Sequence, residues 1–252
     1  MLLLLEEIFE KKSIEVNSTG ERIPLHSNTS RDQGLFLQKM FDIAKPYNSL
    51  EVGFAYGIST LFILEKHREI DGQAHAHITI EPDEYWGTSA LHNITKAGLD
   101  RYLDVRRNYS DKVLTELFHK DHRIQFAYID TTKQFDTVMQ DFYFINKILD
   151  VGGVIILDDC GGAWPGIQRV ARFIQTLPNY KIVGRHDMVK KGLKKRIFSF
   201  FLSSLIKMLP YKDKVYPTID FKTDEELQLN YACIAFQKSG HDLRKWDWDE
   251  KF

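Results

Sequence analysis

The most constraining feature of the sequence is a serial alternation of short β-rich runs with amphipathic helical segments. Five strand–helix units follow one another from residue 49 onward: 49–53 with 59–70, 77–81 with 85–97, 103–107 with 111–118, 125–130 with 135–149, and 154–158 with 167–176. Strand–helix units in series favour parallel strands with crossover helices on both faces of one sheet. The pattern predicts an α/β fold with a doubly wound sheet.

Two of the expected strands, at 126–129 and 154–157, are almost continuously apolar. Both faces of a central parallel strand are covered, so these two runs belong in the middle of the sheet. Further strands are expected at 181–183 and 231–236. They would complete a mostly parallel, seven-stranded, Rossmann-like sheet.

The chain of 252 residues suits one large domain with additions. Residues 1–48 are predicted to form an N-terminal helical extension, and residues 49–240 the main domain. An insertion at 185–225 precedes the last strand, and residues 241–252 form a C-terminal tail.

The overall charge and cysteine content exclude several function classes. A formal net charge of −1 gives no global electrostatic reason to expect a nucleic-acid partner. Cys160 and Cys233 lie far apart without metal-ligand spacing, which favours reduced, structural thiols. The sequence contains no run near the roughly 20 apolar residues that a membrane-spanning helix needs. We therefore expect a soluble, cytoplasmic protein.

The first strand of the alternation leads into a turn with two glycines, Gly53 and Gly57, followed by Ser59. Glycines let the backbone turn tightly and lie close to a ligand, and a hydroxyl can cap the next helix. Taken alone, this pattern is equally typical of an ordinary turn. Ala55 replaces the middle glycine of the G-x-G-x-x-G fingerprint, and Glu51 precedes the turn, which argues against a nicotinamide-dependent oxidoreductase.

An acidic residue, Glu81, ends the second strand. A carboxylate at this point can accept hydrogen bonds from both hydroxyls of a ribose, and charge-assisted hydrogen bonds are the stronger kind. A solvent-exposed turn acid is the structural alternative. Because Glu81 occurs together with the glycine turn, the pair favours a nucleotide-like cofactor.

Several motifs occur in one order: the glycine turn, Glu81, the segment 90–99, Asp130 after an apolar strand, and the run 152–159. Together they resemble the class I S-adenosylmethionine (SAM)-dependent O-methyltransferases. The catechol and caffeoyl-coenzyme-A types and the metal-dependent sugar and antibiotic-tailoring types are the most similar. The resemblance covers about residues 35–185.

The resemblance implies SAM as the cofactor. It assigns the methionine part to the glycine turn, the ribose to Glu81 and the adenine to Ser110, for which a helix N-cap is an equal alternative. The positions that it implies for cofactor binding are Glu51, Gly53, Ala55, Tyr56, Gly57, Ser59, Glu81, Ser110 and Asp130.

Three carboxylates end neighbouring strands: Asp130 on the fourth, and Asp158 and Asp159 on the fifth. Like charges gathered at one rim are costly unless a cation or a bound cationic cofactor offsets them. A divalent ion is the natural partner, and all-oxygen ligands favour Mg²⁺, with Mn²⁺ or Ca²⁺ as alternatives. The matching acids are metal ligands in the metal-dependent families, although the catechol and caffeoyl types have Asn at Asp159. Metal-independent relatives can also keep acidic strand ends.

Asp130 and Lys133 repeat the D-x-x-K spacing of the catechol type, in which the lysine is the proposed general base. A hydroxyl bound to Mg²⁺ loses its proton more readily, and a nearby lysine can take that proton. We therefore expect Lys133 and Asp130 to be catalytic. A surface lysine at a helix start is the structural alternative, and the sugar-tailoring types usually have His nearby.

The predicted function is thus SAM-dependent, metal-assisted O-methylation of a small molecule, such as a sugar, a glycosylated natural product or a phenol. Trp164 is a candidate wall of the acceptor pocket. The alternative is a non-catalytic SAM-fold module that binds a protein or membrane partner through the insertion at 188–224. This basic, amphipathic segment suits a lid, a homodimer contact or a peripheral membrane helix, and we favour the first two.

Overall fold

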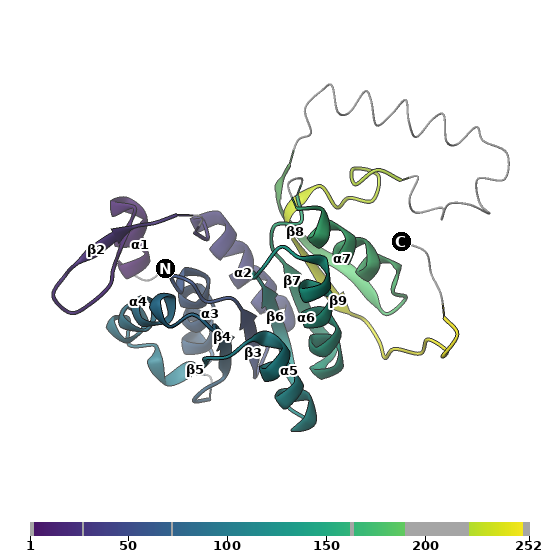
Figure 1. Cartoon of the computed structure of the whole chain (residues 1–252), viewed down its shortest axis with the longest axis horizontal. Coiled ribbons are helices and arrows are strands. Elements are labelled where there is room, and N and C mark those ends of the chain that lie inside the picture. Colours follow the sequence, from purple (N-terminus) through teal and green to yellow (C-terminus); the bar gives the residue numbers. More distant parts are fainter. Residues whose placement is uncertain (1–2, 27, 72, 162–163, 190–221, 249–252) are drawn as a thin grey trace.

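The computed structural model describes residues 3–26, 28–71, 73–161, 164–189 and 222–248. Its main sheet contains seven strands: β3 (Ser49–Val52), β4 (His77–Ile80), β5 (Leu103–Arg106), β6 (Ile124–Ile129), β7 (Leu149–Leu157), β8 (Tyr180–Met188) and β9 (Tyr231–Lys238). Their order across the sheet is β5-β4-β3-β6-β7-β9-β8 (Figure 1). Strands β3 to β7 are parallel, and β9 is antiparallel to both of its neighbours. The predicted doubly wound, seven-stranded sheet is confirmed.

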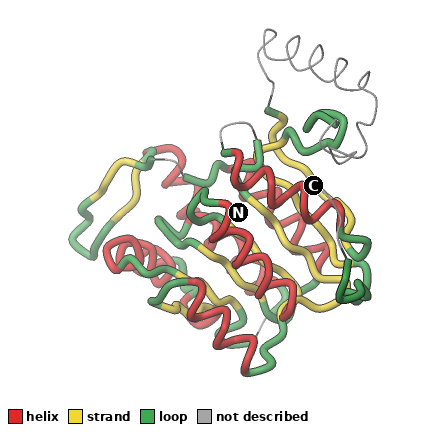
Figure 2. The backbone as a smooth tube through the Cα atoms, turned by 45° about the vertical axis from the view of Figure 1, so that its right-hand side comes forward, coloured by secondary structure: helices red, strands yellow, loops and turns green. Residues whose placement is uncertain are grey.

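Among the described residues, six helices flank this sheet: α2 (Arg31–Ala44), α3 (Ile58–Glu69), α4 (Glu84–Lys96), α5 (Ser110–His119), α6 (Phe135–Ile148) and α7 (Pro165–Thr176). Helices α5, α6 and α7 pack on one face, whereas α2 and α3 pack on the other (Figures 1 and 2). Crossover helices therefore cover both faces of the sheet, as the alternating sequence predicted.

The central strand β6 shows why residues 126–129 are apolar without interruption. Ala127 and Ile129 belong to the core under α5, α6 and α7. Phe126 and Tyr128 belong to the core under α2 and α3. Because successive side chains of a strand point to opposite faces, a strand covered on both sides needs apolar residues at every position.

The carboxyl ends of the strands are level with one another. The residues that follow β3, β6 and β7 each donate a backbone N–H to the last residue of a neighbouring strand, with N–O distances of 2.9–3.0 Å. These residues are Gly53, Asp130 and Asp158. The strand register therefore places three of the predicted site residues on one rim.

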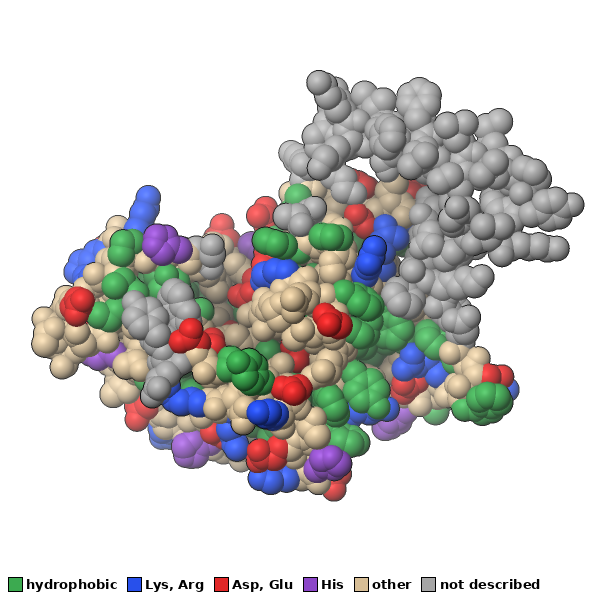
Figure 3. Space-filling view, viewed as in Figure 1, with side chains coloured by type: hydrophobic (Ala, Val, Ile, Leu, Met, Phe, Trp, Pro, Cys, Tyr) green, Lys and Arg blue, Asp and Glu red, His purple; other side chains and the backbone are tan. Residues whose placement is uncertain are grey.

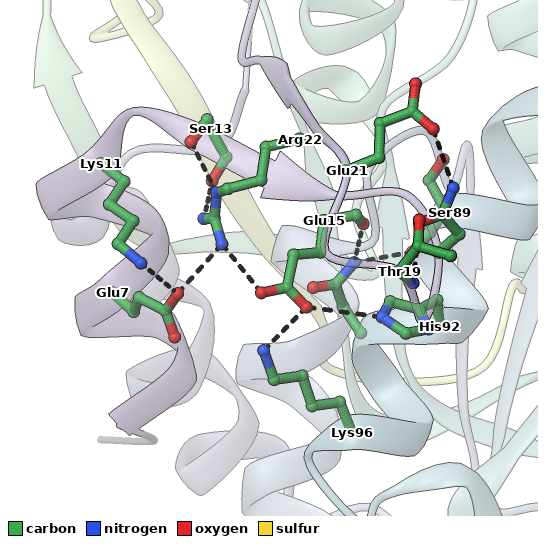
Figure 4. Close-up of polar contacts among 12 residues, drawn as sticks. Glu7, Lys11, Ser13, Glu15, Thr19, Glu21, Arg22, Ser89, His92 and Lys96 are labelled. Carbon is green, nitrogen blue, oxygen red and sulfur yellow. Dashed lines mark hydrogen bonds and ion pairs between the residues drawn. The ribbon is translucent and has the colours of Figure 1, made fainter.

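The N-terminal extension contains a hairpin that the sequence did not predict. After α1 (Leu3–Lys11), β1 (Ser13–Glu15) pairs with β2 (Arg22–Pro24). Glu15 joins this hairpin to α4, because its carboxylate contacts Lys96 at 2.8 Å and Arg22 at 3.1 Å (Figure 4). Strands of three residues are too short to show a periodic pattern, so the predicted helical extension did not include them.

The surface carries no dominant charge on the face seen in Figure 3, where basic and acidic side chains are interspersed. Within the described ranges, no helix combines the length and the apolar character needed to cross a membrane. Most of the predicted insertion, residues 190–221, lies outside the described residues. Its roles as a lid, dimer contact or membrane helix stay predictions.

The packing of α2 generates a first prediction. Phe41 is 1% exposed and packs on Phe126 and His67, whereas Leu35 on the same helix is 46% exposed. Phe41→Ala should lower the free energy of unfolding by about 3–5 kcal/mol, measured by urea denaturation. Leu35→Ala should change it by less than about 0.5 kcal/mol. Equal effects would contradict the assignment of α2 to the core.

Candidate cofactor and metal site

The site begins at a close approach between two strand ends. Gly53 has φ +98°, and a Cβ at this position would lie 1.9 Å from the carbonyl oxygen of Asp130. Both the positive φ and the contact exclude any side chain. Glycine is therefore required where β3 and β6 lie side by side.

The rest of the turn also depends on left-handed backbone. Gly57 has φ +69° and precedes α3, and a Cβ there would lie 2.9 Å from Ala90. Ala55 has φ 41°, an uncommon conformation for a residue other than glycine. The backbone at the middle position of the turn is thus left-handed, although the residue there is alanine and not glycine.

Glu81 lies against this turn. One carboxylate oxygen accepts hydrogen bonds from the backbone N–H groups of Phe54 at 3.1 Å and Ala55 at 3.2 Å. The other accepts from the backbone of Asp83 at 3.0 Å. The two features that the sequence analysis paired, the acid after β4 and the turn after β3, are therefore in direct contact.

Glu51, which the resemblance assigns to the cofactor site, contacts α3 through its side chain. Its carboxylate is fully buried and accepts short hydrogen bonds from the hydroxyls of Ser59 and Thr60. His77 lies 3.4 Å away on the adjacent strand. Glu51 thus fixes the first turn of α3. It thereby positions Ser59, which lines the pocket described next.

A pocket opens above the glycine turn. Four of its residues were not among the predicted positions: Phe54 in the turn, Ile58 at the start of α3, and Asn28 and Thr29 in the segment between β2 and α2. The chain offers a signal for the start of α2, since Ser30 and Gln33 form a capping box. That signal does not show which ligand the preceding residues face. The pocket is lined by Asn28, Thr29, Gly53, Phe54, Ala55, Tyr56, Ile58, Ser59 and Asp130.

Ser110, expected near the adenine, is the first residue of α5, and Tyr109 occupies the N-cap. The alternative that Ser110 is the N-cap is therefore wrong. Asp141 of α6 is fully buried. Burial raises the pKa of the Asp141 carboxyl group to about 6. A hydrogen bond with the Ser110 side chain lowers this pKa, whereas the negative charge of Asp111 raises it.

The three predicted acids come together at the same rim. Oxygens of Asp130, Asp158 and Asp159 all lie within 4.8 Å of one another. The ammonium group of Lys133 is 3.1 Å from Asp130 and 2.5 Å from Asp159. Burial alone would lower the pKa of Lys133, but these two carboxylates prevail and raise it. Burial and the charge of Asp158 raise the pKa of Asp130.

This donor set fits a divalent cation. It offers three carboxylates, the hard oxygen ligands that Mg²⁺ prefers. Lys133 supplies a single positive charge to a cluster of three carboxyl groups, so the cluster has room for more positive charge. A cation bound by Asp130 and Asp159 would take over the contacts that Lys133 now makes.

The loop after the acids continues to α7. Pro165 is the first residue of that helix, and Trp164 is the N-cap with 45% of its surface exposed. Residues 162–163 lie outside the described residues. The assignment of Trp164 to an acceptor pocket stays a prediction.

Cys160 is fully buried, and burial raises the pKa of its thiol, which does not suit a nucleophile.

Comparisons with known proteins agree with this geometry. Residues 50–160 match a family model described as a methyltransferase domain. Among solved structures, the chain is similar to an O-methyltransferase from Bacillus cereus in complex with SAH, with 25% identity, a TM-score of 0.57, and coverage of 71% of this chain and 82% of that one.

Two further structures share the fold. The O-methyltransferase TomG from Streptomyces achromogenes, involved in tomaymycin synthesis and solved with SAM, has 14% identity and a TM-score of 0.59, covering 84% of this chain and 82% of its own. The SAH-bound methyltransferase PaMTH1 from Podospora anserina has 16% identity and a TM-score of 0.57, with coverage of 73% of this chain and 83% of that one. A search of curated proteins finds no match.

The order of the strands is that of the class I methyltransferase fold, and residues 50–160 match a methyltransferase domain. The sequence-based prediction of a SAM-dependent methyltransferase similar to the O-methyltransferases is thereby confirmed.

The contact between Gly53 and Asp130 yields a second prediction. Gly53→Ala should displace the turn and weaken SAH binding by at least about tenfold, measured by calorimetry, because the new Cβ overlaps the Asp130 carbonyl. Gly98 is the control, since it also has positive φ (+66°) but open space around its Cβ position. Gly98→Ala should cost some stability and leave SAH affinity unchanged. Equal loss of affinity in both variants would contradict the steric argument.

Asp141 yields a third prediction. Its pKa of about 6 in the fold exceeds the ordinary value of 3.8, so its contribution to stability is complete below pH 4 and is lost as the pH rises through 6. Asp141→Asn should therefore stabilise the protein at pH 8, by on the order of 2–3 kcal/mol, and much less at pH 4.

Chemical denaturation at both pH values measures this difference. Asp136→Asn, an exposed position on the same helix, is the control and should show no such pH dependence. A stabilisation of Asp141→Asn that is the same at pH 4 and pH 8 would rule out this account.

Proposed function

We propose that this protein transfers the methyl group of SAM to a hydroxyl of a small molecule with the help of a divalent metal ion. Sugars, glycosylated natural products and phenols are the proposed acceptors. The observation that carries the proposal is the position of Asp130, which both lines the pocket at the glycine turn and belongs to the acid cluster with Lys133. One residue thus joins the cofactor site to the proposed acceptor site.

The proposed cofactor contacts follow the rim of the sheet. The backbone from Gly53 to Gly57 would hold the methionine part, with Thr29 and Ser59 beside it in the same pocket. Glu81 would accept hydrogen bonds from the ribose, for which its carboxylate is already positioned at the turn. Ser110, at the start of α5, would contact the adenine. In these roles, the residues would direct the methyl group toward Asp130.

Asp130, Asp158 and Asp159 would hold the metal ion. When bound, a divalent ion lowers the pKa of a hydroxyl that it contacts. Lys133 lies beside the same carboxylates and would accept the hydroxyl proton at Nζ. Because Asp130 and Asp159 favour the ammonium form of Lys133, this role requires the two acids to be engaged elsewhere.

The transfer itself depends on alignment. The rim residues would hold the acceptor oxygen about 3–3.5 Å from the methyl carbon and in line with its bond to sulfur. The new bond joins oxygen to carbon, and the electron pair of the broken carbon–sulfur bond stays on sulfur. The hydroxyl proton goes to Lys133. The products are the methyl ether and SAH.

The alternative of a non-catalytic module depends on the insertion at 188–224. Residues 190–221 of that segment lie outside the described residues. The contact of Glu81 with the glycine turn and the gathered acids instead favour the enzymatic role.

Binding experiments test the cofactor and metal parts of the proposal separately. Calorimetric titration with SAH should show binding to the wild type and loss of at least about tenfold in affinity for Glu81→Ala, since a charge-assisted acceptor is removed. Asp130→Asn/Asp159→Asn should abolish Mg²⁺ uptake. A folded wild type that binds no SAH would disprove the enzyme proposal.

Substitution of Lys133 tests the base. Both Lys133→Arg and Lys133→Met should lower the rate of SAH release with a panel of sugar and phenol acceptors by about 10²–10⁴-fold, with SAH affinity little changed. Lys120→Met, at an exposed lysine on the preceding α5–β6 connection, is the control. If Lys133→Arg keeps full activity, Lys133 serves as a counter-charge and the base is another group.

A further inference from the structure

We propose that Gln33, Tyr128 and Cys233 are positioning residues that fix the carboxylate of Asp158 for the bound cation. This inference rests on the proposed function, because it concerns the metal ion assigned there to the acid cluster. Gln33 is the key member, since it comes from α2, 125 residues before Asp158 in the chain.

Both oxygens of Asp158 are held by donors. One accepts hydrogen bonds from the Tyr128 hydroxyl and from the Gln33 amide, each at 2.8 Å. The other accepts from the Cys233 thiol at 2.9 Å and from the backbone N–H of Asp159 at 2.8 Å. Donors from α2, β6 and β9, together with the adjoining backbone, fix the plane of the carboxylate. A cation bound by Asp158 would use an acceptor position that one of these donors now occupies.

Two of these donors are fully buried side chains of the sheet, Tyr128 on β6 and Cys233 on β9. Asp130 and Asp159 instead contact the ammonium of Lys133, which sits at the end of a flexible chain. Asp158 is therefore the fixed member of the three acids.

The Gln33 amide connects this fixed carboxylate to the wall of the cofactor pocket. Its oxygen accepts from the backbone N–H of Ser30 at 3.4 Å, and the Ser30 hydroxyl accepts from the backbone of Gln33 at 3.2 Å. Its nitrogen donates to Asp158 and also to Tyr128, at 2.9 Å. Ser30 directly follows Thr29 of the pocket wall.

Residues that orient a metal ligand have a known effect on affinity. Removing such a hydrogen-bond partner typically weakens metal binding by about 10–100-fold without removing a ligand. Helix α2 offers a matched control in Gln38, which is also partly buried. Its amide donates to the backbone of Phe62 at 3.0 Å and to Glu65 at 2.9 Å.

The test is a Mn²⁺ titration of the full-length protein, with free Mn²⁺ followed by electron paramagnetic resonance. Gln33→Met should weaken Mn²⁺ binding by about 10–100-fold. Gln38→Met should keep the wild-type affinity for Mn²⁺, even if both variants lower the melting temperature. Cys233→Ala should weaken binding, whereas Cys233→Ser, which keeps a donor, should restore most of it. SAH affinity, measured by calorimetry, should be unchanged in Gln33→Met.

Two results would overturn the inference alone: wild-type Mn²⁺ affinity in Gln33→Met, or an equal loss in Gln38→Met, which would show that the stability of α2 is responsible. A wild type that binds SAH but no Mn²⁺ would overturn both the metal part of the proposed function and this role of Gln33. The cofactor part would then remain.

Discussion

The site depends on the main-chain contact between Gly53 and Asp130, at the point where the strand order reverses between β3 and β6. In an open α/β sheet, this reversal leaves a crevice beyond the carboxyl ends of the strands. The parallel register brings the two residues level, and only a residue without a side chain fits there. The cofactor turn and the acid cluster can therefore share Asp130.

Electrostatics govern the other half of the site. Three carboxylates within 4.8 Å repel one another, and the structure offsets this in two ways. Lys133 supplies a positive charge to Asp130 and Asp159. Asp158 instead receives hydrogen bonds from Gln33, Tyr128 and Cys233. The rim thus has one carboxylate, Asp158, that is held by hydrogen bonds, and two, Asp130 and Asp159, that contact the Lys133 ammonium. A bound cation could replace that ammonium, so the arrangement suits reversible binding of a cation.

The N-terminal segment contributes more to the site than its position in the chain suggests. Helix α2 covers the sheet with Phe41 and its neighbours in the core. Its start carries Thr29 to the pocket wall and Gln33 to the acid cluster. The hairpin before it is held to α4 through Glu15. A segment outside the alternating units thereby forms one side of the site.

The sequence alone determined the seven-stranded sheet and the residues that follow its parallel strands, because period and glycine turns are local properties. It could therefore nominate Gly53, Glu81 and the three acids, which the register then brings to one rim. It did not determine every strand bound, since β7 begins at Leu149 and not at 154, and β8 continues to Met188 and not to 183. Only the tertiary structure decided that the Glu51 carboxylate is buried against α3 and that Asn28, Thr29 and Gln33 reach the site. These are contacts between distant segments, and they depend on how helices pack across a sheet, which no local pattern encodes.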